Sequence, residues 1–270
     1  EKLSDAYIIE FRWEPASFSF ASLAGAVGDV PLPPYIKRNA EEQDANRYQT
    51  IFAQQEGSVA APTAGLHFTE TVFEKLNEKN IDKAFLTLHV GAGTFKPVKA
   101  VSMLGHEMHA EYIDVAMETI LQLKSATGNI VVAGTTSLRT VETLYWLGVK
   151  TLLQPGLEKL SLGQWDVYET ALAASMFSKE EAFTGLINWM SKNNLRNIFT
   201  NTHLLVAPGY RFRVASLLIT NFHQPQSTLL LLVAAAAGND WKKLYDYALE
   251  NDFRFLSYGD SNLVFIKQEE

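Results

Sequence analysis

Apolar and polar positions along this chain predict strands and helices in succession from residue 58 onward. Short β-branched and aromatic runs predict strands, and these runs cover residues 85–90, 112–115, 129–133, 203–207, 211–220 and 262–267. Apolar residues at helical spacing predict helices, which cover residues 70–80, 118–126, 134–147, 178–192, 229–237 and 240–250. Strands that alternate with helices favour an α/β fold with a mostly parallel sheet. In such a sheet, chemistry usually lies where strands end and helices begin.

Capping residues mark several of these helix boundaries. Thr69 and Ser178 each precede a predicted helix, and Ser227 and Thr228 precede the apolar run 229–237. The hydroxyls of these residues suit a helix N-terminus. An acidic pair follows Ser178 in the first turn, where the helix dipole favours negative charge. Gly238 follows the apolar run 229–237 and predicts the end of that helix.

The first 50 residues follow a different pattern. A strand is predicted over residues 6–13, almost at the start of the chain, so we expect the chain to be a fragment of a longer protein. Residues 28–50 are typical of a linker, because prolines between positions 31 and 34 remove backbone donors and fix φ. Within this stretch, Lys37, Arg38 and Arg47 are a possible phosphate-facing group.

Composition narrows the class of protein. The 270 residues are 47% hydrophobic and 20% charged, which is typical of a globular chain with one large domain or two smaller ones. The absence of cysteine excludes disulfides, thiolate metal sites and a cysteine nucleophile, and it agrees with a cytoplasmic protein. The longest apolar run, 229–237, is too short to span a membrane. The net charge of −7 argues mildly against a nucleic-acid partner, which usually meets a basic surface.

Small residues cluster within 60–68, directly before the cap of a predicted helix. Such a stretch predicts a tight turn where the backbone approaches a ligand or another element, with Thr63 and Gly65 as candidate binding residues. His67 lies between two apolar residues. Taken alone, it is more often a packed or capping histidine than a catalytic one.

A predicted strand runs into a glycine loop at 87–95, where Gly91 and Gly93 resemble half of a dinucleotide-binding fingerprint. The third glycine and the following helix are missing, because Lys96 and Pro97 come next. We therefore interpret this loop as a place where the chain passes close to a ligand, rather than as a dinucleotide site.

His106, His109 and Glu111 lie close together and by residue type could ligate a metal. Their spacing does not match the HExxH zinc motif, and Gly105 interrupts any helix that would align them. A histidine and a carboxylate that transfer protons near a substrate explain the segment at least as well.

The segment 134–139 follows a predicted strand and opens a predicted helix. Backbone amides at a helix N-terminus favour an anion, and the hydroxyls of Thr135, Thr136 and Ser137 add donors. Arg139 adds a guanidinium suited to a carboxylate or phosphate. Ordinary helix capping with a surface arginine is an equally good interpretation.

A predicted strand, a polar turn and a capped apolar helix follow one another over 218–228. Asn221 and His223 lie at the carboxyl end of this strand, where the ligand sites of open α/β sheets gather. Taken alone, the pattern is most simply a helix cap and a buried, hydrogen-bonded histidine.

Taken together, these segments resemble S-adenosylmethionine:tRNA ribosyltransferase-isomerase, a family of queuosine biosynthesis. Each motif is short, but the motifs occur in the family's order over nearly the whole chain from residue 28 onward. The matching stretches are 31–36, 47–49, 60–68, 87–95, 106–112, 134–139, 220–229 and 257–260.

The resemblance implies a reaction. Such enzymes transfer and isomerise the ribosyl group of S-adenosylmethionine onto the aminomethyl group of a 7-deazaguanine base in tRNA. The product is epoxyqueuosine, and adenine and methionine are released. S-adenosylmethionine is thus a consumed co-substrate, and no other cofactor, metal or membrane is implied. The implied fold is a barrel-like α/β domain with a small inserted β-barrel domain.

The resemblance also implies site residues. A sulfonium acidifies the ribose C5′ protons, so a base can form an ylide, and the available proton movers are His67, His89, His106, His109, His223 and Glu111. Arg139 and the amides of 135–137 suit the methionine carboxylate, and Glu111 or Asp260 suits the sulfonium charge. Candidate substrate-binding residues are Thr63, Gly65, Gly91, Gly93, Thr135, Thr136, Ser137, Arg139, Asn221 and Asp260.

The chain departs from the family pattern in three ways. We expect residues 1–27 to be the tail of the inserted β-domain and 28–270 to be the catalytic domain, with the family's N-terminal part absent. Residues 150–205 are longer than usual and are predicted to be an insertion. Gln224 stands where an apolar residue is usual. Two alternatives follow: a non-catalytic or altered-substrate relative that binds RNA or S-adenosylmethionine, and a metal-dependent hydrolase that uses His106, His109 and Glu111.

Overall fold

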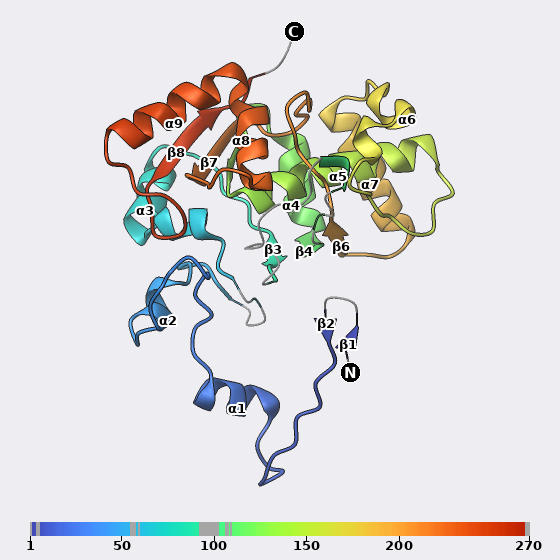
Figure 1. Ribbon diagram of the computed structural model, residues 1–270. Helices are drawn as coiled ribbons and strands as arrows, with labels where there is room; N and C mark the ends of the chain where they lie inside the picture. The colour runs from blue at the N-terminus through green and yellow to red at the C-terminus, as the bar shows by residue number, and fades with distance from the viewer. Residues whose placement is uncertain are drawn as a thin grey trace.

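The computed structural model describes residues 2–3, 6–54, 58, 60–91, 103–105, 108 and 110–267, and these form a mixed α/β fold (Figure 1). The strands are β1 (Lys2–Leu3), β2 (Ala6–Tyr7), β3 (Thr87–His89), β4 (Glu111–Ala116), β5 (Val131–Ala133), β6 (Asn197–Thr202), β7 (Leu217–Asn221) and β8 (Ser261–Phe265). The helices are α1 (Phe20–Val27), α2 (Asp44–Arg47), α3 (Glu70–Glu78), α4 (Met117–Ser125), α5 (Thr135–Leu153), α6 (Thr170–Ala173), α7 (Lys179–Lys192), α8 (Thr228–Ala237) and α9 (Trp241–Glu250). Short 3₁₀ turns cover Thr63–His67, Met103–Gly105, Asp166–Tyr168 and Gly238–Asp240.

The described strands form three small sheets. β1 pairs with β2, β4 lies between β3 and β6, and β7 lies between β5 and β8. Within these sheets β5 and β7 run parallel, whereas the other pairs are antiparallel. The prediction of a mixed α/β fold is confirmed, whereas the prediction of a mostly parallel sheet is wrong for the described strands. A barrel-like arrangement stays a prediction.

The direction of β8 has a simple cause. A parallel neighbour requires a crossover that carries the chain back to the other end of the sheet. Between β7 and β8 the chain passes through two helices, α8 and α9. It leaves the carboxyl end of β7 and returns to that same end. Ser261 at the start of β8 consequently pairs with Asn221 at the end of β7.

Helix boundaries follow the predicted caps. The hydroxyl of Thr69 accepts a hydrogen bond from the backbone N–H of Val72 and begins α3. Ser178 and Glu181 form a reciprocal capping box at the start of α7. Ser227 caps α8 in the same way as Thr69 caps α3. These predicted helices are confirmed, with α5 running further than predicted.

The core is built around α5, which is buried along most of its length. α5 packs against α7, whose residues Phe183, Leu186 and Met190 are fully buried. Figure 1 shows α6 and α7 on one side of α5 and α8, α9, β7 and β8 on the other. No helix in the described part of the chain is long and apolar enough to cross a bilayer.

The predicted strand over 211–220 begins only at Leu217, and another predicted strand is absent. Residues 203–207 form an extended, irregular stretch, and the strand β6 lies just before it. The backbone groups of this stretch are satisfied by other parts of the chain: Arg139 donates to the Leu204 carbonyl, and Tyr168 donates to the Leu205 carbonyl. A buried apolar run therefore forms here without a ladder of strand hydrogen bonds.

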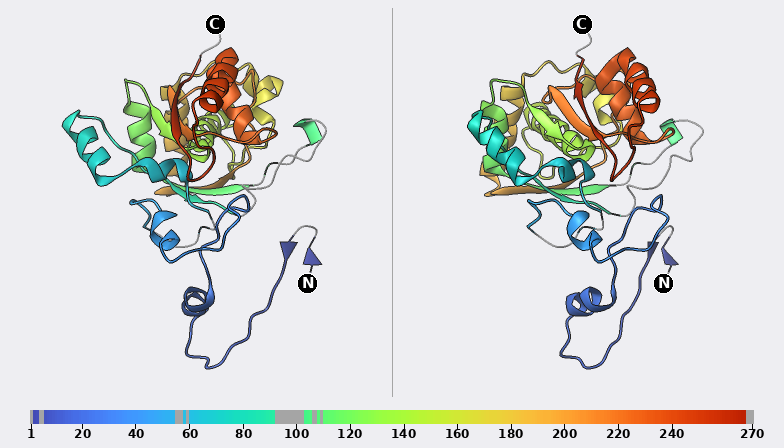
Figure 2. Two further views of the ribbon diagram at one scale, coloured as in Figure 1. Left: turned by 60° about the vertical axis from the view of Figure 1, so that its left-hand side comes forward. Right: turned by 90° about the vertical axis from the view of Figure 1, so that its left-hand side faces the viewer.

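The N-terminal segment extends away from the body of the molecule (Figure 2). The predicted strand over 6–13 is limited to Ala6–Tyr7, and α1 follows at Phe20–Val27. The proline-containing stretch after α1 is irregular, as predicted. The predicted origin of residues 1–27 in an inserted β-domain stays a prediction, as does an insertion at 150–205.

Candidate active site

A cleft of about 200 Å³ lies where the parallel strands β5 and β7 end side by side. Its walls come from the turn at 60–64, the start of α5 and the segment 220–229, together with Tyr35 and Ser257. The predicted site residues brought together at this cleft are Thr63, Thr135, Thr136, Ser137, Asn221 and His223.

The first wall is the N-terminus of α5. Gly134 precedes the helix with a φ of 95°, a conformation that favours glycine, and its N–H donates to the Ile219 carbonyl at 2.9 Å. This bond ties the end of β5 to β7 and aims the helix start at the cleft. The first-turn amides of a helix lack intrahelical acceptors and carry the positive end of its dipole. The wall therefore offers donors to a negatively charged ligand group.

The second wall is the N-terminus of α8, which the Ser227 hydroxyl caps through the N–H of Leu230 at 3.1 Å. Thr228 and Gln224 also line the cleft on this side. The described residues that line the cleft include no Asp, Glu, Lys or Arg. An anion in the cleft would therefore be held by backbone dipoles and neutral donors, with no side-chain charge on the described walls.

Among the described histidines, His223 is the one that lines the cleft. It is 8% exposed, and its Nε2 lies 2.9 Å from the hydroxyl of Thr220. Its backbone N–H donates to the Tyr245 hydroxyl at 3.0 Å. Burial lowers the pKa of His223 from 6.5 to about 4, so the imidazole is neutral at pH 7.

The buried neutral imidazole makes stability depend on pH. Between pH 6.5 and about 4, the unfolded chain binds a proton at this residue and the folded chain does not. Stability is therefore lost as the pH falls through this window. We expect His223 to contribute a loss of about 2 kcal/mol in the free energy of unfolding between pH 7 and pH 5.

Urea unfolding at both pH values, on the wild type and on His223→Gln, measures this loss. The variant should lack this part of the decrease, because glutamine does not titrate. An equal decrease in the two proteins would contradict the assignment to His223.

Asn221 connects the cleft to His67. Its Nδ2 donates to His67 Nε2 and to the Leu256 carbonyl, each at 3.1 Å. Partial burial lowers the pKa of His67, although the nearby Asp260 carboxylate opposes that shift. His67 and Asp260 line an open surface hollow next to the cleft. Arg254 donates to the Asp260 carboxylate from its side chain at 2.9 Å and from its backbone at 2.7 Å.

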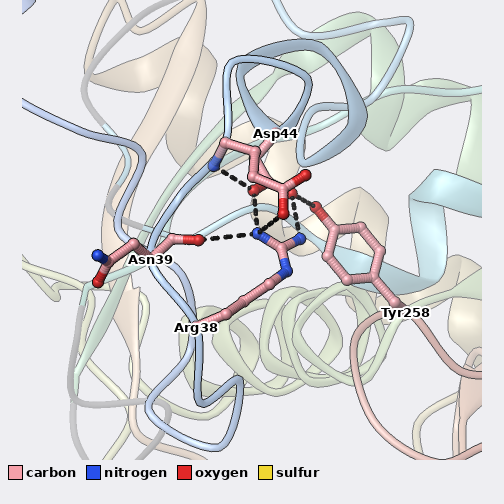
Figure 3. Close-up of polar contacts among 5 residues, drawn as sticks. Arg38, Asn39, Asp44 and Tyr258 are labelled. Carbon is pink, nitrogen blue, oxygen red and sulfur yellow. Dashed lines mark hydrogen bonds and ion pairs between the residues drawn. The ribbon is translucent and has the colours of Figure 1, made fainter.

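A cluster around Asp44 holds the segment before the cleft against the C-terminal loop (Figure 3). Asp44 is 2% exposed and accepts hydrogen bonds from both terminal nitrogens of Arg38, from the Glu41 N–H and from the Tyr258 hydroxyl. The Arg38 guanidinium holds the pKa of Asp44 far below its usual value. Next to this cluster, the Tyr35 hydroxyl hydrogen-bonds to Ser257 at the cleft.

A sequence profile of the family described as queuosine biosynthesis protein matches residues 1–264. The chain belongs to this family. Among solved structures, it is similar to the S-adenosylmethionine tRNA ribosyltransferase from Thermotoga maritima, with 29% sequence identity and a TM-score of 0.47. The match covers 75% of this chain and 51% of that one, so the chain spans about half the length of this solved relative.

In this member of the family, Arg139 does not line the cleft. It is 4% exposed and donates to Glu111 Oε2 at 2.9 Å, to the Leu204 carbonyl at 2.9 Å and to the Thr202 carbonyl at 3.1 Å. Glu111 is 5% exposed beside it. The predicted ligand contacts of both residues do not fit this placement, because α5 turns position 139 toward the protein interior.

Three other predicted residues also lie outside the cleft lining. His89 alternates with the cleft-lining Leu88 along β3, so its ring faces the other side of the sheet and meets the Phe199 ring at 6.2 Å. Gly65 is buried against Thr50 and Phe52, where a Cβ would lie under 3.0 Å from both side chains. Gly91 is exposed.

Several predicted residues of this family member lie outside the described residues, namely Gly93, His106 and His109. Within the described part of the chain, no group of three or more metal-ligating side chains occurs.

Sequence reasoning missed the Asp44 cluster and the Tyr35–Ser257 pair. Tyr35 and Ser257 lie in stretches that match the family, which was a usable signal. No comparable signal marks Asp44, because an acidic residue in a stretch of mixed charges looks like an exposed surface residue. Arg38 was predicted to face phosphate, but its guanidinium forms an ion pair with Asp44.

Proposed function

We propose that this chain carries the S-adenosylmethionine site of a ribosyltransferase-isomerase of queuosine biosynthesis. The reaction would move the ribosyl group of S-adenosylmethionine onto the 7-aminomethyl-7-deazaguanine base of a tRNA. It would form epoxyqueuosine and release adenine and methionine. The observation that carries the proposal is the cleft, where family-matching segments from distant parts of the sequence meet.

Each wall of the cleft has a role in this proposal. The amides at the start of α5 bind the methionine carboxylate, with the hydroxyls of Thr135 and Ser137 as further donors. His223 takes up the proton removed from the ribose, because it lines the cleft and is neutral at pH 7. Thr220 holds the ring of His223 in place. Arg139 has no direct role, since its guanidinium is buried with Glu111.

The proposed catalytic domain is residues 28–270, because every described residue that lines the cleft lies between Tyr35 and Ser257. Residues 1–27 are proposed to belong to an inserted β-domain and 150–205 to be an insertion. A cytoplasmic location accompanies a tRNA substrate.

Turnover of S-adenosylmethionine tests the function. We expect adenine release and epoxyqueuosine when the chain is mixed with S-adenosylmethionine and tRNA that carries the aminomethyl-deazaguanine base. His223→Ala should lower the rate by at least about 100-fold, as expected for loss of a general base. Mass spectrometry of the nucleosides and chromatography of free adenine measure both products.

The matched control is His203→Gln, because His203 does not line the cleft and its ring only approaches the Met108 carbonyl at 3.4 Å. This variant should keep wild-type turnover. Full activity in His223→Ala would remove that residue from the mechanism. A wild-type chain that binds no S-adenosylmethionine in calorimetry would overturn the proposal as a whole.

The altered-substrate alternative has one supporting observation, since Gln224 lines the cleft and is exposed to an incoming ligand. Binding of S-adenosylmethionine without formation of epoxyqueuosine would favour this alternative. No observation of this kind favours the metal-dependent hydrolase, because the Glu111 carboxylate accepts a hydrogen bond from Arg139.

A further inference from the structure

We propose that Asn221 binds the α-ammonium group of S-adenosylmethionine through its side-chain oxygen and thereby selects a ligand with an intact amino-acid portion. This inference rests on the proposed function, which assigns the cleft to S-adenosylmethionine but does not say which group of the ligand Asn221 contacts. It starts from the hydrogen bonds of one buried side chain.

The orientation of the Asn221 amide is fixed by its neighbours. The Leu256 carbonyl can only accept a hydrogen bond, so the group that faces it at 3.1 Å must be Nδ2. The other hydrogen of Nδ2 is directed at His67 Nε2. Both donors are thereby used, and Oδ1 is turned away from these two acceptors.

This oxygen has no hydrogen-bond partner among the described residues, although Asn221 is only 2% exposed. A buried acceptor without a donor is costly and rare in native structures. Since Asn221 lines the cleft, a ligand seated there can supply the missing donor. The ligand group must carry an N–H or O–H, because an amide oxygen can only accept a hydrogen bond.

The neighbouring wall narrows the identity of that group. Asn221 ends β7, and the start of α5 follows directly after β5, the adjacent parallel strand. Neighbouring strands lie about 5 Å apart. An anion site and a hydrogen-bond acceptor at this separation suit a zwitterion, whose carboxylate and ammonium share one carbon. The adenine amino group is a donor too, but adenine has no anion for the α5 N-terminus.

A comparison of two ligands tests the proposal on the 270-residue chain. S-adenosylmethionine and 5′-methylthioadenosine share the adenosine and the sulfur, but the second lacks the amino-acid portion. By titration calorimetry, we expect the wild type to bind S-adenosylmethionine about 100-fold more tightly than 5′-methylthioadenosine. The difference comes from two charged contacts, that of the carboxylate with the start of α5 and that of the ammonium with Asn221. Asn221→Ser should lower this preference about tenfold and leave the affinity for 5′-methylthioadenosine nearly unchanged.

Asn262→Ser is the matched control. Both polar atoms of the Asn262 side chain are likewise buried without a partner in the described part of the chain, but Asn262 does not line the cleft. Its substitution should leave the ligand preference as it is in the wild type.

Three outcomes would overturn the assignment of Asn221 to the ammonium. One is an unchanged preference in Asn221→Ser, and another is an equal loss of affinity for both ligands, which would place Asn221 against adenosine. The third outcome is measured on the wild type, so it remains a test even if Asn221→Ser does not fold. In this outcome, an analogue that keeps the carboxylate but lacks the α-ammonium binds the wild type as tightly as S-adenosylmethionine does. Absence of binding by both ligands would instead refute the proposed function.

Discussion

Glu142→Ala should lower the free energy of unfolding by about 3–5 kcal/mol, because it removes the acceptor of four hydrogen bonds, three of them buried and one partly buried. Glu142 lies in the middle of α5 and is fully buried. Its carboxylate accepts from the Tyr210 hydroxyl at 2.8 Å and from three consecutive backbone N–H groups, those of Arg213 and Val214 at 2.9 Å and Ala215 at 3.1 Å. Alanine leaves these donors buried without a partner.

The position of these donors explains why the effect is large. Residues 213–215 lead directly into β7, whose far end forms the cleft. Trp146, one turn further along α5, donates to the Tyr210 hydroxyl at 2.8 Å and extends the same network. The carboxylate of Glu142 therefore holds the segment that leads into β7 against α5.

Urea unfolding measures the change, with two variants for comparison. Glu142→Gln keeps the shape but places an NH₂ group against N–H donors, so it should lose a smaller amount, about 2 kcal/mol. Glu158→Ala removes an exposed glutamate and should change stability little. A loss below about 1 kcal/mol in Glu142→Ala would contradict the role of this network.

Local patterns in the sequence predicted local structure well. Thr69, Ser178 and Ser227 cap their helices as expected, because a cap depends only on residues within the next turn. The start of α5 and the end of β7 were placed together by the general behaviour of parallel strands. That part of the candidate site needed no knowledge of distant contacts.

Errors arose where distant parts of the chain decide the outcome. Residues 203–207 have the apolar character of a strand, but the side chains of Arg139 and Tyr168 donate hydrogen bonds to carbonyls of this stretch. The same arginine was predicted to face solvent or a ligand, because its burial depends on Glu111, which a helix-start motif does not reveal. Asp44 was missed for a similar reason, since its partner Tyr258 comes from the far end of the sequence.

Arg139→Ala should destabilise the fold by about 3–5 kcal/mol, because it leaves the buried Glu111 carboxylate without its guanidinium partner. The two side chains are 5% and 6% exposed, so water cannot replace the lost contact. Burial lowers the pKa of Arg139, and the Glu111 charge opposes that shift, so the carboxylate helps to keep the buried guanidinium charged. The carbonyls of Leu204 and Thr202 lose a donor as well.

The double variant Glu111→Leu, Arg139→Met separates charge from packing. Because it removes both buried charges and keeps apolar volume, it should regain at least half of the stability lost in Arg139→Ala, as measured by urea unfolding. A double variant as unstable as Arg139→Ala would show that the lost hydrogen bonds to Leu204 and Thr202, rather than the lost ion pair with Glu111, carry the effect.

The same double variant decides between a structural and a ligand-binding arginine. If Arg139 acts only inside the protein, the folded double variant should bind S-adenosylmethionine within about twofold of the wild type. A guanidinium that held the methionine carboxylate would contribute a charge-assisted contact, and its loss would weaken binding by about tenfold or more. We expect the first result, because the cleft reaches the amides at the start of α5 while Arg139 lies behind them against Glu111.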